Sequence, residues 1–181
     1  MEDAQIISMF ATESTRQEAF KLLLKKYQQK VYWHVRRMVI NHDDADDVTQ
    51  DIFVKVWRNL EKFREDSQLY TWLYRIATNE CITFLNKKKQ KQNISLDDDN
   101  SSYLAETLAD GSYFNGDKAQ LKLQQALLTL PEKQRLVFNM KYFEDLKYDE
   151  ISEILGTSVG ALKASYHLAV KKIEGFFSNN D

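Results

Sequence analysis

The chain has 181 residues, of which 43% are hydrophobic and 29% charged, with a formal net charge of −2. It holds only five Gly and one Pro, so the turn residues that a sheet needs are scarce and an all-α protein is predicted. One Cys excludes an internal disulfide, no signal-peptide pattern opens the sequence, and no run of about 20 apolar residues could span a membrane, so we expect a cytoplasmic protein without stable membrane insertion.

Three helical patterns follow one another in the first half of the chain. Apolar residues three and four positions apart predict a long helix over Thr15–Ile40, a second over Asp44–Leu60 and a third that begins near Ser67. The polar run Asn41–Asp43 supplies a stop and an N-cap between the first two. A short helix before Thr12 is also expected.

Residues 93–117 break this periodicity. Asn, Asp, Ser and Gly dominate there, and the segment holds six acidic residues and no basic one. Residues 1–92 hold 16 Lys and Arg against 13 Asp and Glu, and residues 118–181 hold nine against eight. We therefore expect two small helical domains, 1–92 and 118–181, joined by an acidic linker with one helical turn near Tyr103–Leu108.

The C-terminal block opens with a Leu-rich helix over Lys118–Thr129. Pro131 suits the first turn of the next helix, which should run to about Phe143. Tyr148–Leu155 is then predicted as a short helix, and Gly156 as its left-handed terminator.

A second helix follows this glycine turn, with Ser158 as its N-cap. Two short helices around such a turn match a DNA-binding helix-turn-helix, although an ordinary helical hairpin would look similar. Only Lys163 is basic in the first two turns of the second helix, so this domain alone should bind DNA weakly. The residues expected to face duplex DNA are Thr157, Ser158, Gly160, Ala161, Lys163, Ala164, Ser165, His167 and Lys171.

The order of these patterns resembles the extracytoplasmic-function (ECF) group of bacterial sigma-70 factors. The matching stretches are DADDVTQDIFVKVWRNLEKF, TWLYRIATNECITFLNKKK and LLTLPEKQRLVFNMKYFEDLKYDEISEILGTSVGALKASYHLAVKKI. The resemblance implies a sigma factor, not an enzyme, that binds core RNA polymerase, directs it to promoters and promotes DNA melting. It implies that residues 1–92 (region two) bind the β′ clamp and the single-stranded minus-ten element. It also implies that residues 118–181 (region four) bind the β flap and the duplex minus-thirty-five element, and that an anti-sigma protein is a partner.

The helix predicted over Asp44–Leu60 carries an acidic and amide-rich stripe opposite its apolar face. Asp43, Asp44 and Asp46 are assigned mainly a local role, because acidic groups favour a helix N-terminus. Without the resemblance, that role would explain the whole acidic run. With it, the residues placed at the core polymerase interface are Asp47, Gln50, Asp51, Val54 and Arg58.

The third helix carries Arg, Asn and Thr at steps of three and four and ends in lysines. Stacking and hydrogen bonds to base edges hold single-stranded DNA, and lysines neutralise phosphates. Trp72 is assigned to the core, while Tyr70 and Tyr74 are left open. The minus-ten contacts implied by the resemblance are Arg75, Thr78, Asn79, Thr83, Asn86, Lys87, Lys88 and Lys89.

The loop before this helix is implied to form a pocket for one flipped base, although a plain surface loop would have the same composition. Its candidates are Glu65, Asp66, Ser67 and Gln68. Asn86 and Ser165 stand where many relatives carry Arg, and Thr83 where Asp is common. The promoter sequence therefore cannot be carried over from the family.

Two other functions remain open from the residues alone: a dimeric helix-turn-helix repressor and a helical adaptor that binds only protein. The linker could mimic RNA through Asp97–Asp99 or serve as a solvated tether. His34, His42, His167 and Cys81 show no metal-ligand spacing, and no phosphate loop or nucleophile motif is present. We therefore predict no metal, cofactor or catalytic residue.

Overall fold

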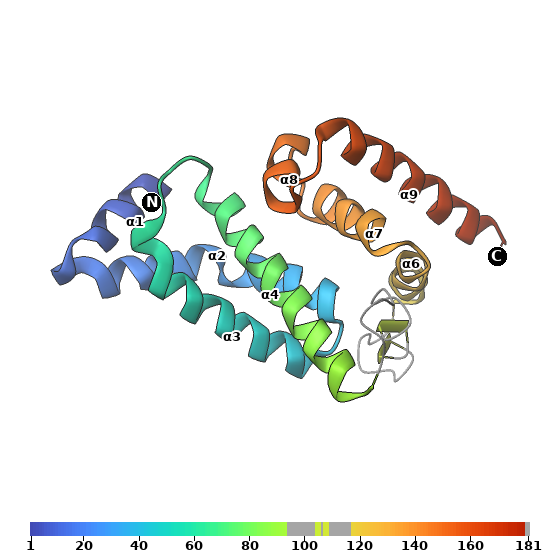
Figure 1. Cartoon of the computed structure of the whole chain (residues 1–181), viewed down its shortest axis with the longest axis horizontal. Coiled ribbons are helices and arrows are strands. Elements are labelled where there is room, and N and C mark those ends of the chain that lie inside the picture. The colour runs from blue at the N-terminus through green and yellow to red at the C-terminus, as the bar shows by residue number, and fades with distance from the viewer. Residues whose placement is uncertain (94–103, 106, 109–116, 180–181) are drawn as a thin grey trace.

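The computed structural model describes residues 1–93, 104–105, 107–108 and 117–179. Within these residues all regular structure is helical, and it forms two groups, one at each end of the molecule (Figure 1). The prediction of an all-α protein built from two small helical domains is confirmed.

The N-terminal domain is a bundle in which α1, α3 and α4 pack around the long helix α2. Its core contains fully buried apolar residues from all four helices, Cys81 among them. Asn41 ends the α2 region and caps α3 as predicted, because its Oδ1 accepts a hydrogen bond from the Asp44 N–H at 3.0 Å. The helices are α1 (Asp3–Ala11), α2 (Arg16–Val39), α3 (His42–Asn59) and α4 (Leu69–Lys91), with 3₁₀ turns at Glu13–Thr15 and Leu60–Lys62.

The C-terminal domain begins at Asp117, whose carboxylate accepts the Ala119 N–H and caps the first helix. Its helices are α6 (Lys118–Leu128), α7 (Glu132–Phe138), α8 (Tyr148–Leu155) and α9 (Val159–Asn179). A π-helical turn, Asn139–Phe143, extends α7 to the end predicted from the sequence.

Most of the predicted linker lies outside the described residues, including Asp97–Asp99. Of the turn expected near Tyr103–Leu108, the structure describes Leu104, Ala105, Thr107 and Leu108, and all four are helical. Leu104 and Leu108 are buried in the core cluster of the N-terminal domain.

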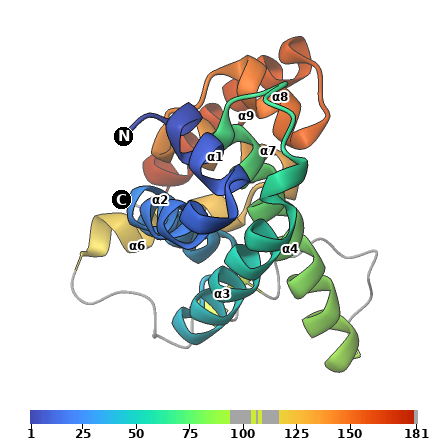
Figure 2. The same ribbon diagram turned by 90° about the vertical axis from the view of Figure 1, so that its left-hand side faces the viewer.

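The two domains touch directly, which the sequence did not predict. Helix α8 packs along α4, and both views place these helices side by side (Figures 1 and 2). Tyr74 of α4 joins an apolar cluster of the C-terminal domain that includes Met140, Ile151 and Leu162. In return, Leu136 joins the core cluster of the N-terminal domain. Helix α3 lies on the side of its domain away from α8 (Figures 1 and 2).

Candidate polymerase and nucleic-acid interfaces

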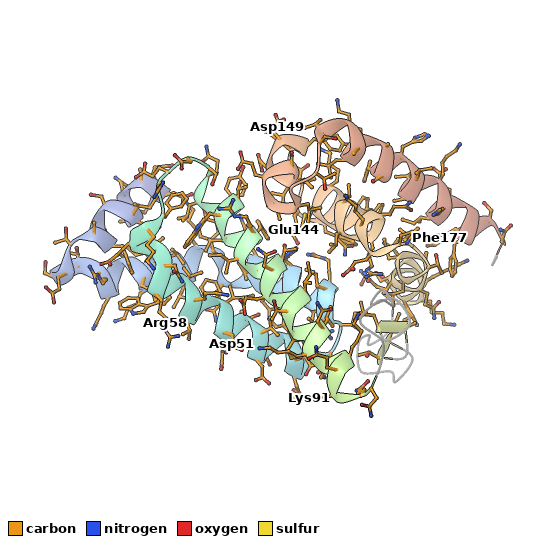
Figure 3. All side chains as sticks on the ribbon, viewed as in Figure 1. Asp51, Arg58, Lys91, Glu144, Asp149 and Phe177 are labelled. Carbon is orange, nitrogen blue, oxygen red and sulfur yellow. The ribbon has the colours of Figure 1, made fainter. Side chains whose placement is uncertain are left out.

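The polar stripe of α3 is open to solvent. Every member is exposed: Asp47, Gln50, Asp51, Val54 and Arg58. Figure 3 shows Asp51 and Arg58 along the outer side of α3. Val54 is 49% exposed and lies next to exposed Trp57 on the same helix, so the two form an apolar surface beside the stripe. The stripe is therefore free to meet another surface.

An apolar groove of about 960 Å³ lies beside this stripe, between α2 and α3. Gln50 and Val54 line it, and so does Trp57, which is 37% exposed. Trp57 packs edge-on against Phe10 and Phe20, with ring centroids 5.2 and 5.0 Å apart. Sequence reasoning missed the groove and Trp57, although Trp57 follows Val54 by one helical step of three residues.

Two ion pairs tie α3 to α4. Lys55 pairs with Glu80, and Lys88 pairs with Asp44. Asp44, expected to act mainly on its own helix end, thus also bridges two helices. Lys88, predicted to hold DNA backbone, is held by Asp44 in this structure.

The outer face of α4 agrees only in part with the predicted minus-ten face. Arg75, Asn79, Thr83 and Lys87 are exposed, and Asn86 is half-buried. Two other predicted members, Thr78 and Lys89, are buried and do not lie on this face.

Thr78 is 1% exposed and Lys89 is 2% exposed. The Thr78 hydroxyl donates to the Tyr74 carbonyl at 2.7 Å, and its Oγ1 lies 2.9 Å from Nε2 of buried His34. The predicted place of Thr78 and Lys89 on the exposed face is therefore wrong for this structure. Thr78 lies three residues after Arg75 on α4, and at that position its side chain faces α2, where it contacts His34.

The loop before α4 forms a small pocket of about 150 Å³. Asp66 and Ser67 line it, whereas Glu65 and Gln68 are exposed residues of the same loop outside the lining. Trp72 forms part of the wall, with its ring 5.4 Å from that of Phe63. Trp72 is half-buried, so it serves both the core and this surface. Three basic side chains also line the pocket: Lys62, Arg64 and Arg75. Of these, only Arg75 was predicted from the sequence.

The helix-turn-helix is formed as predicted. Gly156 ends α8 with φ of 66°, in the left-handed region that glycine adopts most easily. Ser158 Oγ accepts the Ala161 N–H at 3.3 Å at the start of α9. Leu162, Ala169 and Ile173 face inward. Among the residues expected to face DNA, Thr157 and Ser165 are partly buried, and those exposed are Ser158, Gly160, Ala161, Lys163, Ala164, His167 and Lys171.

A buried polar cluster lies where the two domains meet, and sequence reasoning missed it. Glu144 accepts a hydrogen bond from the Tyr74 hydroxyl at 2.8 Å and pairs with Arg37. Burial raises the pKa of Glu144, while Arg37 acts in the opposite direction. Burial and the nearby Glu144 charge raise the pKa of Tyr74. Burial and nearby Arg37 lower the pKa of His34 to about 3, so this imidazole is neutral at pH 7.

None of the helices in the described parts of the chain is long and apolar enough to cross a membrane. His42, Asp43 and Asp46 can bring ligand atoms within 4.8 Å of one another, but all three are exposed at the start of α3. The arrangement thus offers binding surfaces: a groove with a polar rim, a polar helix face with a pocket, and an exposed recognition helix.

Two family models match the chain in the order of its two domains. Sigma-70 region 2 matches residues 23–91, and Sigma-70 region 4 matches residues 120–173. The ECF RNA polymerase sigma factor SigW of Bacillus subtilis is 34% identical over 158 residues, covering 83% of this chain and 84% of that protein. The ECF RNA polymerase sigma-E factor of Escherichia coli strain K12 is 33% identical over 168 residues, covering 87% and 86%.

Solved structures share the fold. CnrH, in complex with the cytosolic domain of CnrY, matches with a TM-score of 0.71 at 22% identity over 99% of both chains. The sigma factor RpoE of Bartonella quintana, in complex with the anti-sigma factor NepR, matches with a TM-score of 0.69 at 19% identity, covering 90% of this chain and 98% of that one. The chain belongs to the sigma-70 family, in its ECF group, and is a sigma factor that directs RNA polymerase to promoters.

Proposed function

We propose that the chain divides promoter recognition between its two domains. Residues 1–92 bind core polymerase and the single-stranded minus-ten element, and capture of that strand promotes melting. Residues 118–181 bind the β flap and the duplex minus-thirty-five element, and residues 93–117 tether the two. The chain performs no catalysis of its own, and it acts in the cytoplasm because the polymerase works there.

The β′ clamp is assigned to the polar stripe of α3 and the adjoining groove. An acidic stripe suits a basic partner helix, and the apolar groove offers a site for its side chains. Val54 and Trp57 support this assignment, because both are exposed apolar residues where the stripe meets the groove.

The opened strand is assigned to the exposed face of α4 and the pocket beside it. Asn79 and Thr83 can hydrogen-bond base edges, and Arg75 can pair with phosphate. A base flipped into the pocket would meet the Trp72 ring and the polar groups of Asp66 and Ser67. Such stacking contributes about 1–3 kcal/mol per base, which can offset a flipping cost of a few kcal/mol.

Duplex DNA is assigned to α9. Its first turns present Gly160, Ala161 and Ala164, whose small side chains allow close approach to base edges in the major groove. Lys163 and Lys171 supply the phosphate contacts. So few cations predict weak binding of the free protein to DNA, and this argues against a repressor that binds its operator unaided.

An anti-sigma protein is proposed as a further partner. The Bartonella quintana relative was solved with such a protein bound, and the present chain shares that fold over 90% of its length.

One observation supports this proposal most strongly. The same chain presents an exposed recognition helix, α9, and an exposed polar face of α4 beside a basic, aromatic pocket. Run-off transcription with core polymerase on genomic DNA, with start sites mapped, tests it. We expect products from discrete start sites only when the protein is added. No promoter-dependent product from folded protein would refute the proposal. A gel shift with and without core polymerase separates it from the repressor and adaptor alternatives.

A further inference from the structure

A second pocket lies next to the one formed by the loop before α4. It is found between the last turns of α3 and the first turns of α4, where the two helices pack side by side (Figure 1). Its volume is about 270 Å³, against about 150 Å³ for the first. We call it the α3–α4 pocket and the first the loop pocket. The residues that line the α3–α4 pocket are Lys55, Asn59, Lys62, Trp72 and Ile76.

We propose that the α3–α4 pocket binds one nucleotide of the opened DNA strand, the upstream neighbour of the base that enters the loop pocket. Two consecutive unstacked bases are then held, one in each pocket, with Trp72 between the pockets and Lys62 at the phosphate that joins the two nucleotides. This inference rests on the proposed function and adds to it a second subsite for the opened strand. It also gives the end of α3 a part in reading DNA.

The side chains that the two pockets share supply the first argument. Only Lys62 and Trp72 line both pockets among the described residues. Trp72 is half-buried, and its ring packs 5.4 Å from that of Phe63, which lines only the loop pocket. Aromatic rings hold unpaired bases of any sequence by stacking, and lysines neutralise phosphates. A ring and a cation where two pockets adjoin therefore suit two consecutive nucleotides and the phosphate between them.

The path of the strand along α4 supplies the second argument. Four side chains follow one another at steps of four, three and four residues and so share one side of the helix: Trp72, Ile76, Asn79 and Thr83. A strand that contacts exposed Asn79 and Thr83 thus reaches the α3–α4 pocket next. The linker to the domain assigned to the minus-thirty-five element leaves from the opposite end of α4, after Lys91. The α3–α4 pocket therefore lies upstream of the loop pocket along the strand.

Asn59 gives the pocket a group that can read a base edge. Its Nδ2 donates to the Lys55 carbonyl at 2.8 Å, which fixes the orientation of the amide. Within the described parts of the chain Asn59 Oδ1 makes no hydrogen bond, so it can accept one from an amino group. Adenine, cytosine and guanine carry an amino group, and thymine does not. The α3–α4 pocket should therefore select against thymine.

The first test removes single bases from the strand. Holoenzyme assembled from the full chain and core polymerase is bound to a promoter template whose minus-ten strand is already unpaired, and affinity is measured by fluorescence anisotropy. Each base of the strand is replaced in turn by an abasic residue. The loop pocket is located as the position where this loss weakens wild-type binding about tenfold but weakens Ser67→Phe, which fills that pocket, less than about twofold.

The upstream neighbour of that position is the decisive one. Loss of its base should weaken wild-type binding about tenfold, and it should weaken Asn59→Phe, which fills the α3–α4 pocket, less than about twofold. Gln17→Phe makes the same change at an exposed amide at the start of α2, outside both pockets, and should respond like wild-type protein. If the loss costs wild-type protein less than about twofold, or costs Asn59→Phe as much as Gln17→Phe, the pocket holds no nucleotide and the inference is overturned.

Base choice and salt dependence test the two named contacts. With intact strands, wild-type holoenzyme should bind cytosine at the upstream neighbour about fivefold more tightly than thymine, and Asn59→Ala should show less than about a twofold preference. Equal binding of the two bases by wild-type protein would overturn the role of Asn59. Lys62→Ala should reduce the slope of log affinity against log salt by about 0.7, the value of one phosphate contact on a single strand, whereas Lys21→Ala on exposed α2 should not. An unchanged slope for Lys62→Ala would remove Lys62 from the phosphate.

These measurements also separate the inference from the proposed function. If base loss matters at the loop pocket but not at its upstream neighbour, the proposed function stands and the second subsite fails. If no abasic position weakens wild-type binding, the assignment of the opened strand to α4 fails with it. Should Asn59→Phe not fold, as judged by urea unfolding, the cytosine preference of wild-type protein against Asn59→Ala decides the subsite.

Discussion

His34 Nε2 lies 2.9 Å from Thr78 Oγ1, and this buried contact joins α2 to α4 directly behind the interdomain surface. The His34 ring also packs edge-on against Tyr74, with centroids 5.1 Å apart. The Tyr74 ring thus contacts His34 of the N-terminal domain while its hydroxyl reaches Glu144 of the other domain. The α4 helix therefore serves the core, the interdomain contact and the proposed DNA face at once.

Burial of His34 should make stability depend on pH. Its folded pKa is about 3, against about 6.5 in an unfolded chain. Between these values the unfolded state binds more protons, so stability falls as the pH drops below about 6.5. From pH 7.5 to 5.0, wild-type protein should lose about 2 kcal/mol more than His34→Gln, which cannot titrate. Urea unfolding at both pH values measures this, and equal losses would contradict a neutral buried histidine.

The exposed stripe and groove of α3 should matter for polymerase and not for folding. Val54→Glu places a charge where an apolar contact is proposed, so affinity for core polymerase should fall at least about tenfold. Because Val54 is 49% exposed, the melting temperature should change little. Ser8→Glu on exposed α1 is the matched control and should bind normally in fluorescence titration. Unchanged affinity of Val54→Glu would remove the groove from the interface.

Neighbouring positions on α4 should give opposite phenotypes. Asn79 is exposed, so Asn79→Ala should slow open-complex formation while leaving stability within about 0.5 kcal/mol. Thr78 is buried and hydrogen-bonded, so Thr78→Val should cost about 1–3 kcal/mol by leaving His34 without that partner. Thermal unfolding and the kinetics of permanganate-reactive complexes separate the two effects. If Thr78→Val is as stable as wild-type protein but slows the opening of promoter DNA, Thr78 belongs to the DNA-binding face after all.

Two glycines of the helix-turn-helix should respond differently to alanine. Gly156 has φ of 66°, so Gly156→Ala should destabilise by about 1 kcal/mol. Gly160 lies in the first turn of α9 with open space around it, so Gly160→Ala should stabilise by up to about 0.5 kcal/mol, less than at a helix centre. Gly160→Leu should keep the fold but weaken duplex binding, because bulk at this position blocks close approach to bases. Calorimetry and fluorescence anisotropy measure the two properties.

Local signals in the sequence were sufficient to predict helix ends and the helix-turn-helix. Asn41, Gly156 and Ser158 each act on groups within a few residues, so their caps follow from local chemistry. The exposed face of α4 was harder to predict, because the helix is covered on two sides by different domains. A period of three and four alone cannot separate buried Thr78 from exposed Asn79.

The interdomain contact had no local signal at all. Arg37 and Glu144 are 107 positions apart, and each has the sequence surroundings of an ordinary charged residue, Arg37 inside a helix and Glu144 just after one. The pairing of Lys88 with Asp44 was missed for the same reason. Long-range electrostatic partners depend on how helices pack, which composition and periodicity do not specify.

Footprinting on a promoter found by run-off transcription tests the division of labour most directly. With core polymerase, wild-type protein should make minus-ten thymines reactive to permanganate and protect the minus-thirty-five duplex from nuclease. Asn79→Ala should lose most of the permanganate reactivity at the minus-ten element but keep the nuclease protection at the minus-thirty-five element. Lys163→Ala should lose the nuclease protection before it loses the permanganate reactivity. If wild-type protein with core polymerase gives neither signal, or if the two variants give the reverse pattern, the account is contradicted.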